Sequence, residues 1–388
     1  MNPILRVLEV EDSASDARLI ERELQRGGFT VEARRVDTAE SLAAALAEPA
    51  WDVILCDHNL PAMDSTSALR MVRSLHPETP FIIVSGSLPE TVAAQAMQYG
   101  AHDFVNKDNL ARLVPAIRRE LADVAERRGR REAERTLLAQ AEDLRIGREI
   151  QQRLFPTSAP SLPNFDLAGV SLPAAATGGD YFDFIPMAGG CTAVVVGDVT
   201  GHGLGPALIM ADARAYLRTL AFNFGNARDI LLRANELLRA DIDADRFVTL
   251  FFGMVCLDRH TFEYLNAGHP AGYLLDRTGA IKTTMASAMP PLGLMPLTDA
   301  PQPVSLPLAP GDLLLLLTDG VLEAASPTGE EFEVERALAV VRAHQARPAA
   351  EIVKALCTGV QTFSAGQPQA DDITVVVVKV SDPAPSKG

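Results

Sequence analysis

The chain has 388 residues, more than one hydrophobic core usually organises, so we expect two or three folded units. Hydrophobic residues make up 47% and charged residues 22% of it, a composition that excludes a disordered or collagen-like protein. The net charge of −15 argues against non-specific binding to nucleic acid or to an anionic membrane.

The four cysteines occur singly, without a CxxC pair: Cys56, Cys191, Cys256 and Cys357. This spacing predicts neither a disulfide framework nor a thiolate metal site, and it fits a reduced compartment. The first residues lack the pattern of a signal peptide, and the longest leucine run, Leu313 to Leu317, is far too short to cross a membrane. We therefore expect a cytoplasmic protein with no membrane partner.

Residues 1–125 alternate short apolar runs with amphipathic stretches, which predicts a first domain of the α/β class with a doubly wound, parallel, five-stranded sheet. The predicted strands are Ile4–Val10, Phe29–Val36, Asp52–Cys56, Phe81–Val84 and His102–Val105. The predicted helices between them are Ala14–Arg26, Ala39–Ala47, Thr66–Leu75 and Pro89–Tyr99.

Residues 126–155 are predicted to form a helical linker. From Asn109 to Arg153 the chain holds eleven arginines against eight acidic residues, and its apolar residues recur at spacings of three, four and seven. Gly129 interrupts this apolar stripe and weakens the helix by about 1 kcal/mol. Two interpretations remain open, a solvated spacer helix or a short parallel coiled coil that pairs two chains, and the second is slightly favoured.

Residues 156–381 are predicted to form a second domain of the α+β class, followed by a disordered tail at 382–388. Its predicted strands are Phe165–Ser171, Tyr181–Pro186, Cys191–Val199, Phe247–Leu257, Tyr264–Asn266, Leu313–Thr318 and Ile373–Val380. Its predicted helices are Gly205–Phe222, Ala227–Asp241, Val334–His344 and Ala349–Phe363.

Polar residues follow the predicted strands of the first domain, at the sheet edge where ligands of parallel sheets bind. Glu11 and Asp12 follow the first strand, Asp57 the third, Ser85 the fourth and Lys107 the fifth. Three carboxylates at one edge repel each other unless a hard cation such as Mg²⁺ neutralises them. A carboxylate beside this ion can attack a phosphoryl donor, and a nearby ammonium and hydroxyl would stabilise the phosphoryl oxygens.

Each of these residues also has an ordinary explanation. Glu11 and Asp12 could cap a helix, and Lys107 could be a solvated loop residue. Their order at successive strand ends favours a functional site.

The same order resembles the receiver domain of bacterial two-component response regulators, through VLEVEDS, DVILCDHNLPAMD, FIIVSGS and GAHDFVNKD. The resemblance implies a flavodoxin-like fold and phosphorylation of Asp57 by a sensor histidine kinase. It implies that Glu11 and Asp12 hold Mg²⁺, together with the backbone carbonyl of Asn59.

The resemblance also implies that Ser85 and Lys107 contact the phosphoryl group and that Phe104 occupies an aromatic switch position. Asp108 stands where proline is common in the family, which leaves this chemistry intact.

Acidic motifs at turns mark a second site: TGGDYFDF with Asp180, GDVTGHG with Asp198, TDGV with Asp319, and DDIT with Asp371 and Asp372. Adjacent glycines let the backbone approach a ligand closely. Carboxylate and carbonyl oxygens suit Mg²⁺ or Mn²⁺, and two such ions can share a water and direct it at phosphorus. A single Asp-Gly pair more often marks a hairpin turn, but the four motifs in this order are a strong signal.

The set resembles the metal-dependent serine/threonine phosphatases of the PPM (type 2C) family, and within it the bacterial branch that controls sporulation and stress sigma factors. EIQQRLFP, NAGHP and PPLGL support the resemblance, which covers residues 146–380. It implies an antiparallel β-sandwich flanked by helices, and two Mn²⁺ or Mg²⁺ ions. The implied ligands are Asp180, Asp198, the carbonyl of Val199, Asp319 and Asp371.

Four further residues of these motifs have open roles. Asp372 stands where related enzymes often have Asn and is a candidate for a supporting or ligating role, while Asp183 matches its motif but could simply face solvent. His202 and His269 could shuttle protons, although a hydrogen-bonded structural role is favoured. No arginine lies in an acidic motif, so the group that binds the substrate phosphate is not identified.

We therefore predict a response regulator whose output is a protein phosphatase. Its expected substrate is a phosphoserine or phosphothreonine on a partner protein, by resemblance an anti-sigma-factor antagonist. Phosphorylation is expected to promote a homodimer through the linker helix and to settle the helix at Gly205–Phe222. The alternatives are a non-catalytic adaptor that binds a regulator stoichiometrically, and a DNA-binding regulator, which the absence of a basic recognition segment disfavours.

Overall fold

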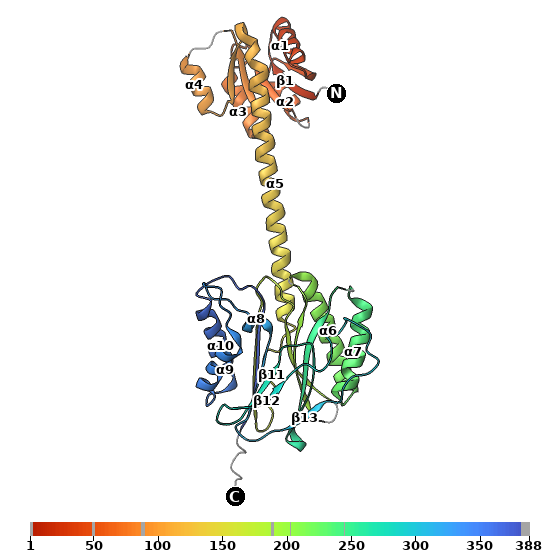
Figure 1. Ribbon diagram of the computed structural model, residues 1–388. Coiled ribbons are helices and arrows are strands. Elements are labelled where there is room, and N and C mark those ends of the chain that lie inside the picture. The colour runs from red at the N-terminus through yellow and green to blue at the C-terminus, as the bar shows by residue number, and fades with distance from the viewer. Residues whose placement is uncertain are drawn as a thin grey trace. The chain divides into compact units, whose positions relative to one another are not determined.

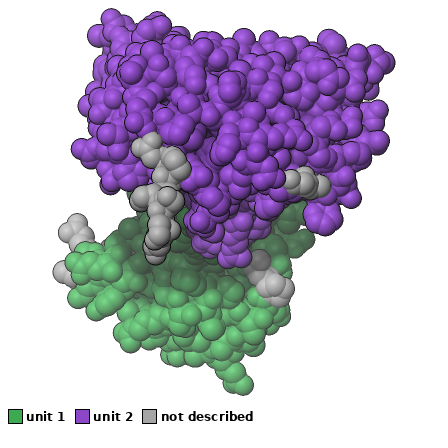
Figure 2. All heavy atoms as spheres, turned by 90° about the horizontal axis from the view of Figure 1, so that it is seen from below, with its two compact units in different colours: residues 1–139 green, residues 140–388 purple. Residues whose placement is uncertain are grey.

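The computed structural model describes residues 3–48, 51–86, 90–187, 190–201, 203–243 and 245–381, with the side chains of residues 90–93 left out. The chain forms two compact units, residues 1–139 and residues 140–388, which Figure 2 shows in different colours. The tail at 382–388, predicted to be disordered, and His202 lie outside the described residues.

The first unit contains the five-stranded parallel sheet that the alternating pattern predicted (Figure 1). Its strand order is β2-β1-β3-β4-β5. Its strands are β1 (Ile4–Val10), β2 (Thr30–Val36), β3 (Val53–Cys56), β4 (Phe81–Ser85) and β5 (Asp103–Asn106). Its helices are α1 (Ala14–Arg26), α2 (Ala39–Leu46), α3 (Ser65–Leu75), α4 (Glu90–Gln98) and the short 3-10 turn at Lys107–Arg112. Helices cover both faces of the sheet. Side chains that point to either face from the central strands are therefore buried.

Helix α5 (Leu113–Gln152) is one continuous helix of 40 residues. It passes through Gly129 without a break, because a single glycine costs only about 1 kcal/mol, which a helix of this length tolerates. Leu113 and Ile117 are buried in the core of the first unit. Farther along, Leu137 and Leu138 are each 66% exposed.

The second unit contains two five-stranded antiparallel sheets, with the orders β13-β10-β9-β8-β7 and β12-β11-β14-β15-β6. The strands are β6 (Phe165–Leu172), β7 (Tyr181–Pro186), β8 (Thr192–Val199), β9 (Val248–Cys256), β10 (Thr261–Ala267), β11 (Gly272–Leu275), β12 (Ile281–Met285), β13 (Val304–Pro307), β14 (Leu313–Leu317) and β15 (Ile373–Val380). The helices are α6 (Leu204–Asn223), α7 (Ala227–Asp241), α8 (Asp319–Leu322), α9 (Glu333–His344), α10 (Ala349–Phe363) and a short 3-10 turn at Leu257–Arg259.

Three buried clusters hold these layers together. One lies between the two sheets and includes Phe182, Phe251 and Val376. A second packs α6 and α7 onto the sheet of β7 to β9, and a third packs α9 and α10 onto the sheet of β14 and β15. The expected β-sandwich flanked by helices is therefore confirmed (Figure 1). The sequence analysis did not identify β11, β12, β13 and α8 as elements, since each has only four or five residues.

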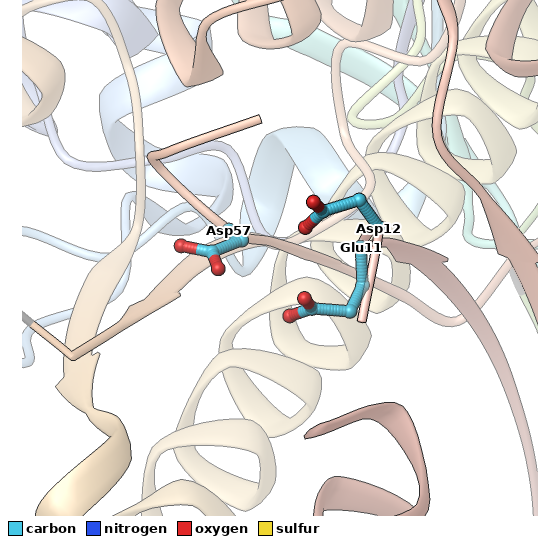
Figure 3. Close-up of side chains that lie close together, drawn as sticks. All are labelled: Glu11, Asp12 and Asp57. Carbon is cyan, nitrogen blue, oxygen red and sulfur yellow. The ribbon is translucent and has the colours of Figure 1, made fainter. Parts of the chain in front are cut away.

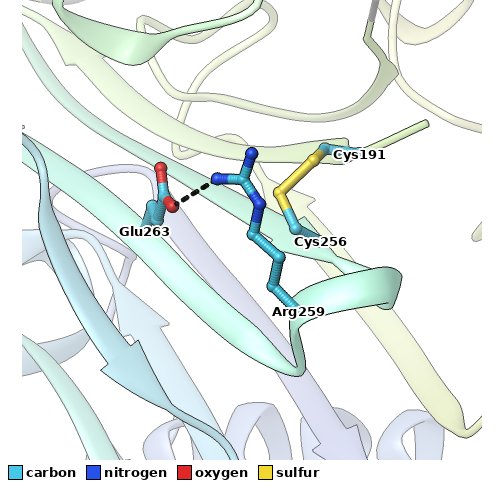
Figure 4. Close-up of a disulfide and its surroundings, with 4 residues drawn as sticks. All are labelled: Cys191, Cys256, Arg259 and Glu263. Atoms are coloured by element: carbon cyan, nitrogen blue, oxygen red, sulfur yellow. Dashed lines mark hydrogen bonds and ion pairs between the residues drawn. A yellow bond between two sulfur atoms is a disulfide. The ribbon is translucent and has the colours of Figure 1, made fainter. Parts of the chain in front are cut away.

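A disulfide joins Cys191 to Cys256, so the prediction that the cysteines form no disulfide is wrong (Figure 4). Cys191 precedes β8 and Cys256 ends β9. Because the strands are antiparallel and Thr192 pairs with Val255, Cys191 and Cys256 lie opposite each other. This pairing depends on strand register, which spacing alone does not give. The cysteine pattern consequently no longer supports a reduced compartment. Among the described helices, none has both the length and the apolar character that spanning a membrane requires.

Candidate functional sites

The acidic residues that follow β1 and β3 meet at one edge of the parallel sheet (Figure 3). β1 and β3 are neighbours, with Val10 paired to Cys56, so the next residues of both strands come together. One carboxylate oxygen each from Glu11, Asp12 and Asp57 lies within 4.8 Å of the other two. Glu11 is 2% and Asp57 9% exposed, and burial raises the pKa of Glu11. A hard cation would neutralise this cluster.

Lys107, directly after β5, links these carboxylates. Its Nζ lies 2.6 Å from Oδ2 of Asp57 and 2.8 Å from Oε2 of Glu11. A third bond, of 2.6 Å, goes to Oδ2 of Asp16 in the first turn of α1. Burial lowers the pKa of Lys107, but these three bonds outweigh it and hold the pKa above its ordinary value; the bond from Lys107 also lowers the pKa of Asp16. Lys107 is therefore an ion-pair partner, and the solvated-loop interpretation is wrong.

Asp16 was missed from the sequence. The available signal was its position in the first turn of the helix that begins directly after the acidic edge of the sheet.

The remaining residues predicted for this site lie around Asp57. Ser85 ends β4 and is fully buried. The backbone N–H of Asn59 donates to Oδ1 of Asp57 at 3.3 Å. Phe104, on β5, is half-buried and packs against the cluster that covers one face of the sheet.

The acidic motifs of the second unit come from both sheets of the sandwich. Asp180 precedes β7 and Asp198 lies near the end of β8, whereas Asp319 begins α8 after β14, and Asp371 and Asp372 precede β15. Burial raises the pKa of Asp198 to about 7, and the negative charges of Asp319 and Asp371 add to the effect. Burial and then Asp371 also raise the pKa of Asp319. The predicted residues are thus close enough to repel one another.

Asp180 is the most deeply buried of the carboxylates predicted as ligands in the second unit, at 2% exposed. Burial and the nearby charge of Asp198 raise its pKa well above the ordinary value. Its Oδ2 accepts a hydrogen bond of 2.8 Å from the hydroxyl of Thr318, a residue missed from the sequence although it directly precedes Asp319.

Glycines allow the loops of this site to approach closely. A Cβ on Gly179 would lie 2.6 Å from the carbonyl oxygen of Val199 and 3.2 Å from Oδ1 of Asp198. A Cβ on Gly320 would lie 2.0 Å from the carbonyl oxygen of Asp372. Any side chain at these positions would push the predicted ligands apart.

Asp372 holds the loop that carries Asp180. Its Oδ1 accepts from the N–H of Ala174 at 2.7 Å, and its Oδ2 accepts from Gly179 at 2.7 Å and from Asp180 at 3.4 Å. Since both oxygens already accept backbone hydrogen bonds, the geometry favours the supporting role for Asp372 over direct ligation.

The residues of the acidic set fit divalent cations. Asp180, Asp198, Asp319 and Asp371 offer carboxylates, and Val199 offers a carbonyl that a Cβ at position 179 would crowd. Burial raises the pKa values of Asp180, Asp198 and Asp319, so holding these carboxylates charged in this place is unfavourable, and a cation would relieve that. Among the described residues, only the first unit brings three such ligand atoms within 4.8 Å, so the acidic set of the second unit is more widely spread.

His269 has the structural role that was favoured. It is 3% exposed, its ring Nδ1 lies 2.9 Å from the hydroxyl oxygen of Thr249, and its backbone N–H donates to Oδ1 of Asn266 at 2.9 Å. Burial lowers its pKa to about 3, so its ring stays neutral near pH 7 and is poorly suited to accept a proton.

Asp183 does not face solvent, and that interpretation is wrong. It is fully buried, and Arg218 of α6 donates to both its oxygens, at 2.6 Å and 2.7 Å. The hydroxyl of Tyr181 donates to it at 2.8 Å. Asp183 thus fixes α6 against β7, next to the acidic set.

Comparison with known proteins agrees with both units. Residues 7–118 match the response regulator receiver domain, and residues 188–381 match the family of Stage II sporulation protein E (SpoIIE). Fold and sites therefore define a response regulator whose second domain has the fold of the metal-dependent protein phosphatases. Since the second match spans half of its length, the chain belongs to the SpoIIE family, with a receiver domain in front.

The chain is similar to Protein IcfG of Synechocystis sp., with 30% identity over 61% of this chain and 41% of that protein. It is 26% identical to Phosphoserine phosphatase RsbU of Bacillus subtilis, over 61% of this chain and 70% of that protein. Among solved structures, the SiaA-PP2C domain of Pseudomonas aeruginosa matches with a TM-score of 0.56 and 24% identity, over 63% of this chain and 98% of that one. This last likeness shows the fold.

Proposed function

We propose that the chain is a metal-dependent serine/threonine protein phosphatase whose activity is controlled by phosphorylation of Asp57. The observation that carries the proposal is the buried acidic set of the second unit, in which burial and neighbouring carboxylates raise the pKa of Asp198 to about 7. Carboxylates held in this way without cations are unfavourable, so the set is built to bind them.

Two Mn²⁺ or Mg²⁺ ions would supply an activated water and charge neutralisation for hydrolysis of a phosphomonoester. Asp180, Asp198, Asp319 and Asp371 would hold the ions with the carbonyl of Val199. A set spread more widely than the receiver triad fits two ions better than one. Thr318 and Asp372 orient these residues through the hydrogen bonds described above.

In the receiver unit, Asp57 would be the phosphoacceptor for a sensor histidine kinase. Glu11 and Asp12, with the carbonyl of Asn59, would hold Mg²⁺ next to it. The ammonium of Lys107, already 2.6 Å from Asp57, would neutralise the incoming phosphoryl oxygens, with Ser85 beside it.

The linker helix would pair two chains. Apolar residues of α5 that have no cover within one chain support this, among them Leu137 and Leu138 at 66% exposed and Ile150 at 58%. Pairing would cover exposed apolar side chains of this helix in a parallel coiled coil. Phosphorylation would then act on α6, which the bonds of Arg218 to Asp183 fix beside the metal loops.

The substrate would be a phosphoserine or phosphothreonine on a partner protein, and an anti-sigma-factor antagonist is the proposed partner. Support comes from the similarity to Phosphoserine phosphatase RsbU. The chain spans well under half of IcfG, so nothing in that similarity fixes the partner. A cytoplasmic location goes with this proposal.

Mn²⁺-dependent phosphate release from a generic phosphoester tests the enzyme. The full chain should turn over the ester, and Asp198→Asn should abolish turnover without unfolding the chain. Stoichiometric binding of a regulator without metal-dependent turnover would favour the adaptor instead. Retained turnover in a folded Asp198→Asn variant would remove Asp198 from the site.

A further inference from the structure

The last turn of α5 is hydrogen-bonded directly to the loop that carries Asp180. Nε2 of Gln151 donates to the carbonyl oxygen of Gly178 at 2.6 Å, and Oε1 of Gln151 accepts from the N–H of Gly178 at 3.1 Å. Gln151 is only 7% exposed, although it lies in a helix whose neighbouring residues are mostly exposed. One side-chain amide therefore satisfies both backbone groups of Gly178.

The opposite side of Gly178 is held by the acidic set itself. A Cβ on Gly178 would lie 2.1 Å from Oδ2 of Asp372, the oxygen that accepts from the N–H groups of Gly179 and Asp180. The loop at 177–180 thus lies between Gln151 and Asp372. Gln151 sets the position of its backbone, and Asp180 is two residues farther along.

A loop held in this way cannot shift without losing buried hydrogen bonds. Removing the amide of Gln151 would leave the N–H and C=O of Gly178 without partners in a buried place, and the loop would move to satisfy them. Movement of the loop would displace Asp180 and loosen the approach of Gly179 to the carbonyl of Val199. Both groups belong to the proposed ligand set.

We propose that Gln151 is a positioning residue that sets the affinity of the phosphatase site for divalent cations. The inference rests on the proposed function only for the identity of the site. Its consequence is that the last turn of α5 and the metal loop move together, so a change at the end of the linker helix alters cation binding directly.

The test compares three variants of the full chain: Gln151→Ala, Gln151→Glu and the control Gln152→Ala. Glutamate keeps an acceptor for the N–H of Gly178 and loses the donor to its carbonyl. Gln152 is the adjacent, exposed residue of the same type on the same helix. All variants carry Asp12→Asn, so that receiver binding does not obscure the titration. Mn²⁺ binding is measured by titration calorimetry, and hydrolysis of p-nitrophenyl phosphate as a function of Mn²⁺ concentration.

Both Gln151 variants should bind Mn²⁺ at the phosphatase site about 10-fold more weakly, the lower end of the loss expected when a group that positions metal ligands is removed, because Gln151 acts on Asp180 through the backbone of Gly178. They should need correspondingly more Mn²⁺ for half-maximal turnover and should approach the parent kcat at saturating Mn²⁺. Gln152→Ala should match the parent. Circular dichroism melts establish that each variant is folded. If Gln151→Ala does not fold, the Mn²⁺ affinity of Gln151→Glu tests the proposal.

Unchanged Mn²⁺ affinity in a folded Gln151 variant would overturn the inference. A lower kcat at saturating Mn²⁺ with unchanged affinity would also overturn it, because it would mean a role outside cation binding. If the parent binds Mn²⁺ but hydrolyses no ester, the proposed function fails, while the comparison of affinities still decides the role of Gln151.

Discussion

The buried ion pair of Arg218 with Asp183 leads to an asymmetric prediction. Removing the arginine as Arg218→Ala leaves a carboxylate with no solvent exposure, whose remaining partners are the hydroxyl of Tyr181, the N–H of Phe184 and Arg214 at 3.7 Å. Removing the charge of the carboxylate as Asp183→Asn leaves an arginine whose side chain is 40% exposed and can turn to water. The first change should therefore cost more.

The expected magnitudes follow from this difference in burial. Breaking a buried pair usually costs about 3–5 kcal/mol, and the partners left to Asp183 place Arg218→Ala near the lower end, at about 3 kcal/mol. Asp183→Asn should cost about 1–2 kcal/mol, since the asparagine keeps hydrogen-bonding capacity and Arg218 reaches solvent. For a unit of this size, about 3 kcal/mol corresponds to a fall in Tm of roughly 6–12 °C.

Differential scanning calorimetry of the full chain measures the fall for the second unit. The single tryptophan, Trp51, is buried in the first unit, so its fluorescence transition is an internal control that should not move. Arg239→Ala, an exposed arginine at the end of α7, should change stability by less than about 0.5 kcal/mol. Equal costs for the two core variants, or a larger cost for Asp183→Asn, would refute the reasoning.

Three further predictions concern the two acidic sites. Gly179→Ala should abolish Mn²⁺ binding by the second unit, because its Cβ would lie 2.6 Å from the carbonyl oxygen of Val199; calorimetric titration with parent affinity would contradict this. Because burial raises the pKa of Asp198 to about 7, the folded, metal-free unit binds more protons than the unfolded chain between roughly pH 4 and pH 7. Its unfolding free energy should consequently fall as pH rises through this window, and Mn²⁺, which displaces these protons, should weaken or reverse the trend within the same window. A metal-free stability that rises with pH would show that the pKa of Asp198 is not raised. Lys107→Ala removes the ammonium that pairs with Asp57 and two other carboxylates. The receiver should therefore lose more stability in chelator than in Mg²⁺, as monitored by tryptophan fluorescence. An equal loss in both conditions would exclude a cation site.

Much of the fold follows from local pattern. The predicted bounds of α1, α7, α10, β7 and β15 match the structure residue for residue, since strong apolar periodicity and nearby polar or turn residues define each one. The strands β11 to β13 were missed because four or five residues show no period, and they lack the continuous apolar run that marks the equally short β3 and β14. The disulfide was not predicted for another reason. Cys191 and Cys256 are 65 residues apart in the sequence, and only the register of β8 and β9 brings them together.

The site residues divide in the same way. The carboxylates lie at or near the ends of strands, and Asp180, Asp198 and Asp319 have glycine neighbours, so sequence motifs could select them. Asp16, Thr318 and Gln151 act through hydrogen bonds to residues that are distant in the sequence. No sequence motif indicates which residue each of them contacts. Asp183 shows the limit of motif reading, because its motif placed it near the site but could not supply Arg218 from a helix 35 residues away.

The central claim is that the receiver controls a metal-dependent phosphatase in the same chain. The most direct test is phosphate release by the purified chain in Mn²⁺, measured with and without a small phosphodonor, for the parent and for Asp57→Asn. The account predicts Mn²⁺-dependent turnover that changes with the donor in the parent, and the same turnover without any donor effect in Asp57→Asn. Turnover that is independent of Mn²⁺, or a donor effect that persists in Asp57→Asn, would contradict it.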